Sequence, residues 1–326
     1  MHRLFRRWSR LAVVTAVASV SLALPAAVRA DEVVFAVADS SLTAVTGLTR
    51  DTANDLYWLA QPSAEGAERS TVYGVDASGQ VLTRLSFPVA TPGLSAASWF
   101  GDVLYLVDTS EVTAATEVPG AITPAGPAVT GAEVSLYGLP TAAVGGDREG
   151  LYTAYTLVYP DGPHDASALL VNPDGQIFLV TTGPVGGLYA VPRDFTADAP
   201  VPLERVGQLP GGVTDGLFLS DRLIALRTDD TVIVIDASTL EEVRQGPIEQ
   251  PGQSLTLGLD GTELMAARDG QPVTVAAVPV PARTAINQAE TLDSQGRRVS
   301  QAGTLIMLGA AVGLALIGGV LVFLRR

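Results

Sequence analysis

The sequence predicts an all-β fold for most of the chain, a β-propeller assembled from groups of four short strands. Short apolar runs rich in Val, Leu and Thr recur along residues 33–280. Asp-Gly and Ser-Gly pairs separate many of these runs, and such pairs favour hairpins because glycine accepts a positive φ. The groups recur about every 40–50 residues, which is the spacing of propeller blades.

Five groups of strands are predicted, starting near residues 42, 93, 165, 213 and 253. The expected strands include 56–60, 71–76, 81–87, 168–172, 176–181, 216–219, 222–227, 231–236, 242–245, 254–259, 263–267 and 273–278. The fifth group lacks an outer strand, and we expect residues 33–37 to supply it and close the ring. Five blades are favoured; six are the alternative because the second group is stretched. A β-sandwich is the main rival, which the repeat disfavours.

Two segments interrupt or follow the repeat. Residues 109–133, rich in Ala, Thr, Pro and Gly, are expected to form a long loop within the propeller ectodomain, which we place at 31–280. Residues 281–303 are polar and lack a core pattern, so we interpret them as a stalk or linker.

The first 30 residues are interpreted as a signal peptide. Four arginines precede an uncharged run at 11–24, and Val28 and Ala30 place small residues at the −3 and −1 positions of a cleavage site. The pair Arg6-Arg7 leaves both the general and the twin-arginine export routes open.

Residues 304–324 are interpreted as one transmembrane helix. This uncharged segment of 21 residues would span about 31 Å as a helix, enough for a bilayer core. Residues 325–326, both arginine, favour a cytoplasmic C-terminus and an ectodomain outside. Gly309 and Gly313 have the spacing of a helix-dimerisation motif, which predicts weak self-association.

The ectodomain is strongly acidic. All 34 Asp and Glu residues and thirteen of the 20 basic residues lie in 31–303, so that segment has a net charge of −21. Such a charge repels nucleic acid and anionic lipid. The chain has no cysteine, which excludes disulfides and thiolate chemistry. Every basic residue is arginine, a bias typical of many actinobacteria.

One segment resembles a known family. Residues 159–175 read YPDGPHDASALLVNPDG, and this is similar to the YPDG-x-HDAEALLVDP motif of a poorly characterised family of secreted, mostly actinobacterial propeller proteins. The similarity covers roughly residues 42–192 and includes Asp108, at the start of an element like the family's DIGDN. It implies a propeller fold, and loosely similar propellers act as hydrolases.

The chain departs from the family at its acidic positions. Ser167 replaces a glutamate, residues 94–99 replace a DWED motif, residues 109–111 replace IGDN, and Thr182 replaces a lysine. Asp108, His164 and Asp165 are retained. The loss of the other acids makes the chain a degenerate member and lowers the expectation of catalysis.

The candidate catalytic residues are His164, Asp165 and Asp108. His164 is the one histidine left after removal of the signal peptide, and Ser167 lies nearby as a candidate nucleophile. The alternative is a loop histidine that hydrogen-bonds its neighbours. No cofactor is expected, but calcium is a candidate ligand because Asp161, Asp165 and Asp174 supply oxygen atoms in the same region.

The sequence therefore predicts a single-pass membrane protein of the cell envelope whose extracytoplasmic propeller binds a partner without catalysing a reaction. The expected partners are another envelope protein, a wall glycan or a small ligand. The competing hypothesis is a cell-surface hydrolase of phosphate esters or glycosides that uses Asp108, His164 and Asp165.

Overall fold

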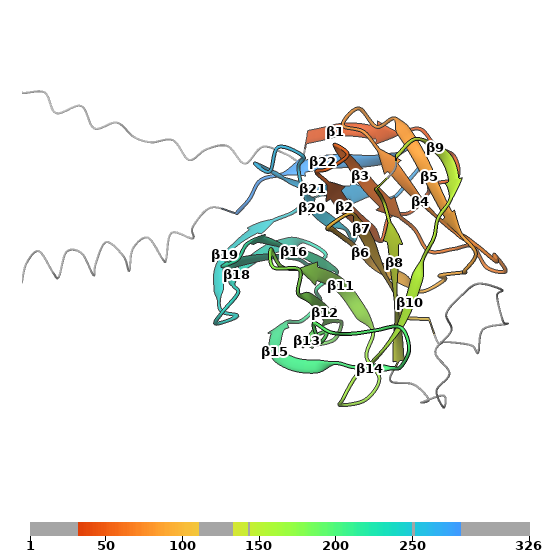
Figure 1. The fold of residues 1–326 in the computed structure, drawn as a ribbon. Helices are drawn as coiled ribbons and strands as arrows, with labels where there is room; N and C mark the ends of the chain where they lie inside the picture. The colour runs from red at the N-terminus through yellow and green to blue at the C-terminus, as the bar shows by residue number, and fades with distance from the viewer. Residues whose placement is uncertain (1–31, 111–132, 143, 250–251, 282–326) are drawn as a thin grey trace, which may run out of the picture. The chain divides into compact units, whose positions relative to one another are not determined.

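The structure is a computed structural model that describes residues 32–110, 133–142, 144–249 and 252–281. Every regular element in this part of the chain is a β-strand, and the strands form five sheets of four or five strands each (Figure 1). We call these sheets blades 1 to 5, in the order of their innermost strands along the chain.

Blades 1 and 2 each have five strands. Blade 1 consists of β2 (Gly47–Asp51), β3 (Leu56–Ala60), β4 (Ser70–Val75), β5 (Val81–Phe87) and β9 (Gly146–Glu149). Blade 2 consists of β6 (Leu94–Phe100), β7 (Val103–Asp108), β8 (Glu133–Pro140), β10 (Thr153–Val158) and β14 (Val201–Pro202).

Blades 3, 4 and 5 each have four strands. Blade 3 consists of β11 (Ala166–Val171), β12 (Ile177–Thr181), β13 (Val185–Ala190) and β15 (Glu204–Pro210). Blade 4 consists of β16 (Asp215–Ser220), β17 (Leu223–Arg227), β18 (Thr231–Asp236) and β19 (Glu242–Pro247). Blade 5 consists of β20 (Leu255–Leu257), β21 (Leu264–Arg268), β22 (Val273–Val278) and β1 (Glu32–Val37).

The five innermost strands form a ring. Strand β2 contacts β6, β6 contacts β11, β11 contacts β16, β16 contacts β20, and β20 returns to contact β2. This arrangement is a five-bladed β-propeller, so the prediction of the fold and of five blades is confirmed. The alternatives of six blades and of a β-sandwich are wrong for the described chain.

The ring is closed by the first described strand. Strand β1 pairs antiparallel with β22 as the outer strand of blade 5, as the sequence predicted for residues 33–37. Phe35 and Val37 are buried on this strand, whereas Val33 and Val34 are about half exposed. The two ends of the described propeller therefore share one sheet, so opening the ring requires breaking that ladder.

The stretched second group does not form a sixth blade; it adds edge strands to its neighbours. After β8 the chain crosses to blade 1, where β9 pairs in parallel with β5, and then returns to blade 2 as β10. Strand β14, from the connection between β13 and β15, pairs in parallel with β10. The expected loop 109–133 is described only at Thr109, Ser110 and Glu133, and its remainder lies outside the described residues.

Apolar side chains fill the space between adjacent blades. The described residues form five hydrophobic clusters, and each cluster joins two neighbouring blades. Trp58 and Phe87 of blade 1, for example, pack with Leu104 and Leu106 of blade 2. Burial of this kind contributes about 25 cal/mol per Å² of apolar surface, so the ring is stabilised mainly at the blade junctions.

Aspartates also join blades, one of them buried and one exposed. Asp215 at the start of β16 accepts hydrogen bonds from the main-chain nitrogens of Gly216 and, at 2.6 Å, of Leu255 in blade 5. Burial raises the pKa of this carboxyl group well above its ordinary value. Asp269, which follows β21, accepts a bond of 2.8 Å from the Val45 nitrogen at the entry to blade 1.

The predicted signal peptide 1–30, stalk 281–303, transmembrane helix 304–324, tail 325–326 and the Gly309–Gly313 pair lie outside the described residues, apart from the first residue of the stalk, Pro281. In the part of the chain that the structure describes, no helix has the length and apolar character needed to span a bilayer.

Arg84 of β5 joins the segment that follows β1 to β9, the outer strand of blade 1. Its Nε donates to Oδ2 of Asp39 at 3.0 Å, and its Nη1 donates to Oδ1 of Asp147 at 3.0 Å. Asp39 lies two residues after the closing strand, whereas Asp147 belongs to β9. Burial alone would raise the pKa of Asp39, but hydrogen bonds from Ser41 and Arg84 outweigh it and lower that pKa.

This ion pair predicts an acid-dependent loss of stability. The lowered pKa means that Asp39 stabilises the fold above the ordinary value of 3.8, and that this contribution is lost as the pH falls through the lowered value. Asp39→Asn should reduce the free energy of unfolding by about 0.5–1 kcal/mol at neutral pH. The difference from wild type should shrink as the pH falls below 3.8, as measured by urea unfolding at a series of pH values. Asp147→Asn, at a more exposed site, is the control and should have a smaller effect.

Candidate ligand-binding site

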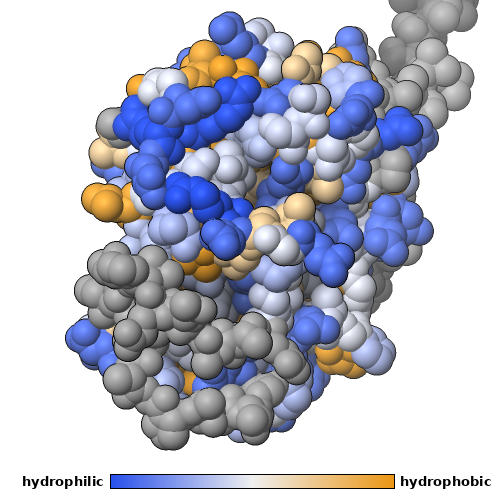
Figure 2. Space-filling model, turned by 90° about the vertical axis from the view of Figure 1, so that its right-hand side faces the viewer, coloured by the Kyte–Doolittle hydropathy of each residue, from blue (hydrophilic) through white to orange (hydrophobic). Residues whose placement is uncertain are grey.

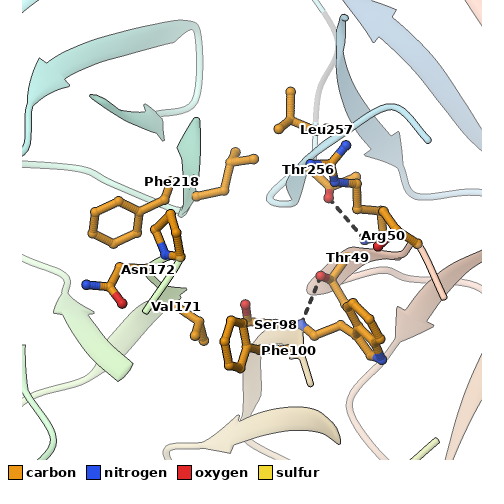
Figure 3. Close-up of a pocket in the computed structure, with 13 residues that line it drawn as sticks. Thr49, Arg50, Ser98, Phe100, Val171, Asn172, Phe218, Thr256 and Leu257 are labelled. Atoms are coloured by element: carbon orange, nitrogen blue, oxygen red, sulfur yellow. Dashed lines mark hydrogen bonds between the residues drawn. The ribbon is translucent and has the colours of Figure 1, made fainter. Parts of the chain in front are cut away.

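A pocket of about 200 Å³ lies where the innermost strands converge (Figure 3). All five blades line it, and most of the lining residues lie at or near the C-terminal ends of the innermost strands. The lining residues are Thr49, Arg50, Thr52, Ser98, Trp99, Phe100, Val171, Asn172, Pro173, Leu217, Phe218, Thr256 and Leu257. The pocket therefore occupies one end of the central channel, and ring closure is required to form it.

Threonine side chains fix two walls of the pocket. Thr49 of β2 accepts a bond of 3.0 Å from the main-chain nitrogen of Trp99 in blade 2. Thr256 of β20 accepts a bond of 3.2 Å from the main-chain nitrogen of Arg50 in blade 1. Because each bond joins innermost strands of different blades, the position of the wall depends on the ring and not on one sheet.

Arg50 is the one charged residue in the pocket lining. Its Nη1 donates to the Gly258 carbonyl oxygen at 3.0 Å. Burial lowers the pKa of Arg50, and the nearby Tyr57 and Asp260 oppose this effect. No carboxylate in the described chain lies within ion-pair distance of its guanidinium group.

Two phenylalanines supply the apolar walls. Figure 3 shows Phe218 and Asn172 on one side of the pocket, Arg50 and Thr256 on the other, and Phe100 below them. Phe100 at the end of β6 is 37% exposed, which is high for a large apolar side chain. Its ring lies against Gly175, where an added Cβ would meet Phe100 Cε1 at 2.7 Å and where φ is +78°. Gly175 thus both forms the turn and makes room for the aromatic ring.

The predicted residue His164 lies in a different place, in a cluster over blade 3. Its Nε2 is 3.0 Å from Oδ1 of Asp161 and 3.1 Å from the Tyr189 hydroxyl. Tyr189 also donates to Asp161, and Arg205 donates to Oδ2 of Asp161 at 2.9 Å. The Tyr159 ring packs edge-on against both His164 and Tyr189. We call these five residues the blade 3 polar cluster.

The charges within the blade 3 polar cluster balance one another. Burial alone would raise the pKa of Asp161, but the bonds from Tyr189 and His164 outweigh it and lower that pKa. Burial, together with the bond to Asp161, raises the pKa of Tyr189 to about 12. Arg205 neutralises Asp161, so the cluster has no excess negative charge with which to hold a cation.

The other catalytic candidates do not join His164. Asp108 ends β7, where it pairs with Leu94 at the start of β6, and it accepts bonds from the nitrogen and the hydroxyl of Ser110. Burial raises the pKa of Asp108. The Ser167 hydroxyl donates to the Val180 carbonyl oxygen at 3.4 Å. Among the described residues, no hydrogen bond or ion pair connects His164 with Asp108, Asp165 or Ser167.

The metal candidates are also distributed along blade 3. Asp165 is exposed and directly precedes β11, whereas Asp174 lies in the hairpin after β11. The length of that strand, about 17 Å, separates the two. Within the described ranges, no three His, Cys, Asp or Glu residues are grouped so as to hold a metal ion.

Sequence reasoning missed the pocket residues. Trp99 lines the pocket, and its Nε1 donates to the Thr141 hydroxyl oxygen at 2.9 Å. Arg50, Phe100 and Phe218 carry no motif that distinguishes them. The one available signal was positional, since innermost strands of a predicted propeller must end near a common axis.

Comparisons with known proteins do not identify a family. No family model matches the sequence, and no curated protein matches it. A solved structure of a gluconolactonase from Xanthomonas campestris shares 14% sequence identity, with 70% of each chain covered and a TM-score of 0.39. A similarity of this size supports no inference about function.

The blade 3 polar cluster predicts a structural role for the Tyr189 hydroxyl. Tyr189→Phe should lower the free energy of unfolding by about 1–2 kcal/mol, because it removes the hydroxyl group that donates to Asp161 and also bonds to His164. Ligand binding at the central pocket should not change. Tyr155→Phe, at a half-buried tyrosine of blade 2, is the matched control. An unchanged stability of Tyr189→Phe in thermal unfolding would contradict this role.

Proposed function

We propose that the protein is a membrane-anchored, extracytoplasmic binding module whose ligand occupies the central pocket. The observation that carries this proposal is the composition of the pocket, in which all five blades contribute a mixture of hydroxyl, amide, guanidinium and aromatic groups. Concave sites of this mixed character are typical of small-molecule binding. The interblade bonds of Thr49 and Thr256 hold the pocket walls before any ligand arrives.

The proposed extracytoplasmic location is inferred from the sequence. The signal peptide predicted at 1–30 and the apolar segment 304–324 would place the propeller outside the membrane, with two arginines inside. The propeller would then present the pocket to the envelope space, where wall components and small solutes are available.

A small ligand fits the observations better than a large protein partner does. On the face shown in Figure 2, hydrophilic residues predominate and hydrophobic residues occur in small, separate groups. The large exposed hydrophobic residues of the described chain come from several blades; they are Val33, Val34, Leu82, Phe100, Leu151, Val185 and Val206. Extended apolar patches are the usual mark of a stable protein interface.

The hydrolase hypothesis receives no support from the geometry. A nucleophilic mechanism needs a base within hydrogen-bonding distance of its nucleophile. His164 instead bonds to Asp161 and Tyr189, and the Ser167 hydroxyl is bonded to the main chain.

The binding proposal predicts that Phe100→Ala weakens ligand binding without unfolding the protein. Phe100 is partly exposed, so its loss should leave no large internal cavity. A panel of soluble wall-glycan fragments and small metabolites should contain ligands whose affinity falls about five- to tenfold in the variant. Binding to the full-length protein in detergent can be measured by ligand-observed NMR.

Phe195→Ala is the matched control, because Phe195 packs on the cluster between blades 2 and 3, away from the pocket. Its ligand affinity should equal that of the wild type. If no compound of the panel binds, or if ligands bind equally well to Phe100→Ala, the central pocket is not the binding site.

A further inference from the structure

We propose that the ligand of the central pocket is a compact ring compound with one carboxylate, which Arg50 and the surrounding hydroxyl groups bind. This inference rests on the proposed function, since it assigns a chemical class to the ligand of the same pocket. Its evidence comes from the bonding of Arg50, from the donors of the lining and from the charge of the pocket.

Arg50 has bonding capacity that the protein does not use. A guanidinium group carries five N–H donors, and the described chain provides one acceptor, the Gly258 carbonyl oxygen. Tyr57 and Asp260 act on Arg50 electrostatically, but neither forms an ion pair with it. A half-buried cation without a counterion is costly, and a carboxylate ligand would supply the counterion in the two-point geometry that arginine favours.

The neighbouring hydroxyl groups offer hydrogens as well. The oxygens of Thr49 and Thr256 already accept main-chain N–H groups, and no acceptor in the described chain takes their hydroxyl hydrogens. Ser98 also lines the pocket and has no described partner for its hydroxyl group. Three hydroxyl donors and a guanidinium group therefore surround the same space, and such a site selects a ligand rich in acceptors.

The charge of the lining distinguishes the pocket from the remainder of the protein. The chain has 34 acidic residues and a net charge of −14, yet no acidic residue lines the pocket. A cationic ligand would therefore meet an arginine without a carboxylate to bind it. A neutral ligand would leave the Arg50 charge unpaired.

The apolar walls limit the size and shape of the ligand. Phe100 lies at one side of the pocket (Figure 3), where it can contact a ring. Phe218 lies on a different side, and its ring also packs against Phe178. A volume of about 200 Å³ is below the usual range of about 300–1,000 Å³ for ligand pockets, so a single ring is favoured. Aromatic acids and uronic acids from wall glycans both have this chemistry.

The test compares three ligands that differ mainly in charge. Benzoate, benzamide and benzylamine are titrated into full-length protein in detergent, with ligand-observed NMR as the readout. Glucuronate and glucose form a second pair that separates a sugar acid from an aromatic acid. In each series the carboxylate should bind at least about tenfold more tightly than its neutral or cationic counterpart. Preference for one carboxylate over the other identifies the source of the ligand.

The variant Arg50→Gln should remove this preference, so that benzoate and benzamide bind with similar affinity. Arg148→Gln is the matched control, because it makes the same charge change in β9 at the outer edge of blade 1. It should retain the preference of the wild type. If Arg50→Gln does not fold, the comparison of benzoate, benzamide and benzylamine on the wild type tests the carboxylate assignment by itself.

The outcomes separate this inference from the proposed function. If benzamide or benzylamine binds as well as benzoate, or if no carboxylate binds, the carboxylate assignment is wrong. Binding of other panel compounds that depends on Phe100 would then leave the pocket as the binding site. If neither the carboxylates nor the panel bind, both proposals are wrong.

Discussion

The structure depends on the antiparallel pairing of β1 with β22. These strands come from opposite ends of the described propeller, and their ladder makes blade 5 a sheet of four strands. The pairing also places Phe35 and Val37 in the cluster that joins blade 5 to blade 1. Without disulfides, this ladder and the interblade clusters must hold the ring together. The two strands are far apart in the sequence, so bringing them together costs chain entropy. The contacts that offset this cost form only when the entire ring forms.

The polar groups near the central axis lie at the two ends of the channel and differ in how they are bonded. Where the innermost strands begin, Asp108 and Asp215 are buried and satisfied by the protein itself. Where those strands end, Arg50 and the hydroxyl groups face a cavity and retain unused donors. The first end behaves as a structural junction, and the second has the properties of a binding site. The blade 3 polar cluster belongs to neither end, because its members bond to one another over the outer strands.

Much of the fold was predictable from the sequence, since hairpin turns such as Asp260-Gly261 and strands such as 81–87 carry local signals. Closure by residues 33–37 was predictable because one group lacked an outer strand. The crossing of β9 to blade 1 was not, because its sequence GDRE has no strand pattern. The pocket was missed because Arg50, Phe100 and Phe218 come from three different blades. Their positions around the common axis depend on strand register, which their local sequence does not indicate. The sequence did bring His164 to attention, but its partner Tyr189 lies on a later strand, as does Arg205, which pairs with Asp161.

The most direct test of the account is hydrogen exchange of the β22 amides, Val273–Val278, in two variants of the closing strand. Val37→Asp introduces a charge at a buried position of β1, whereas Val34→Asp introduces the same charge at an exposed position. If β1 closes the ring, β22 should exchange at least about tenfold faster in Val37→Asp and at the wild-type rate in Val34→Asp. Equal protection of β22 in both variants and the wild type would contradict closure by β1.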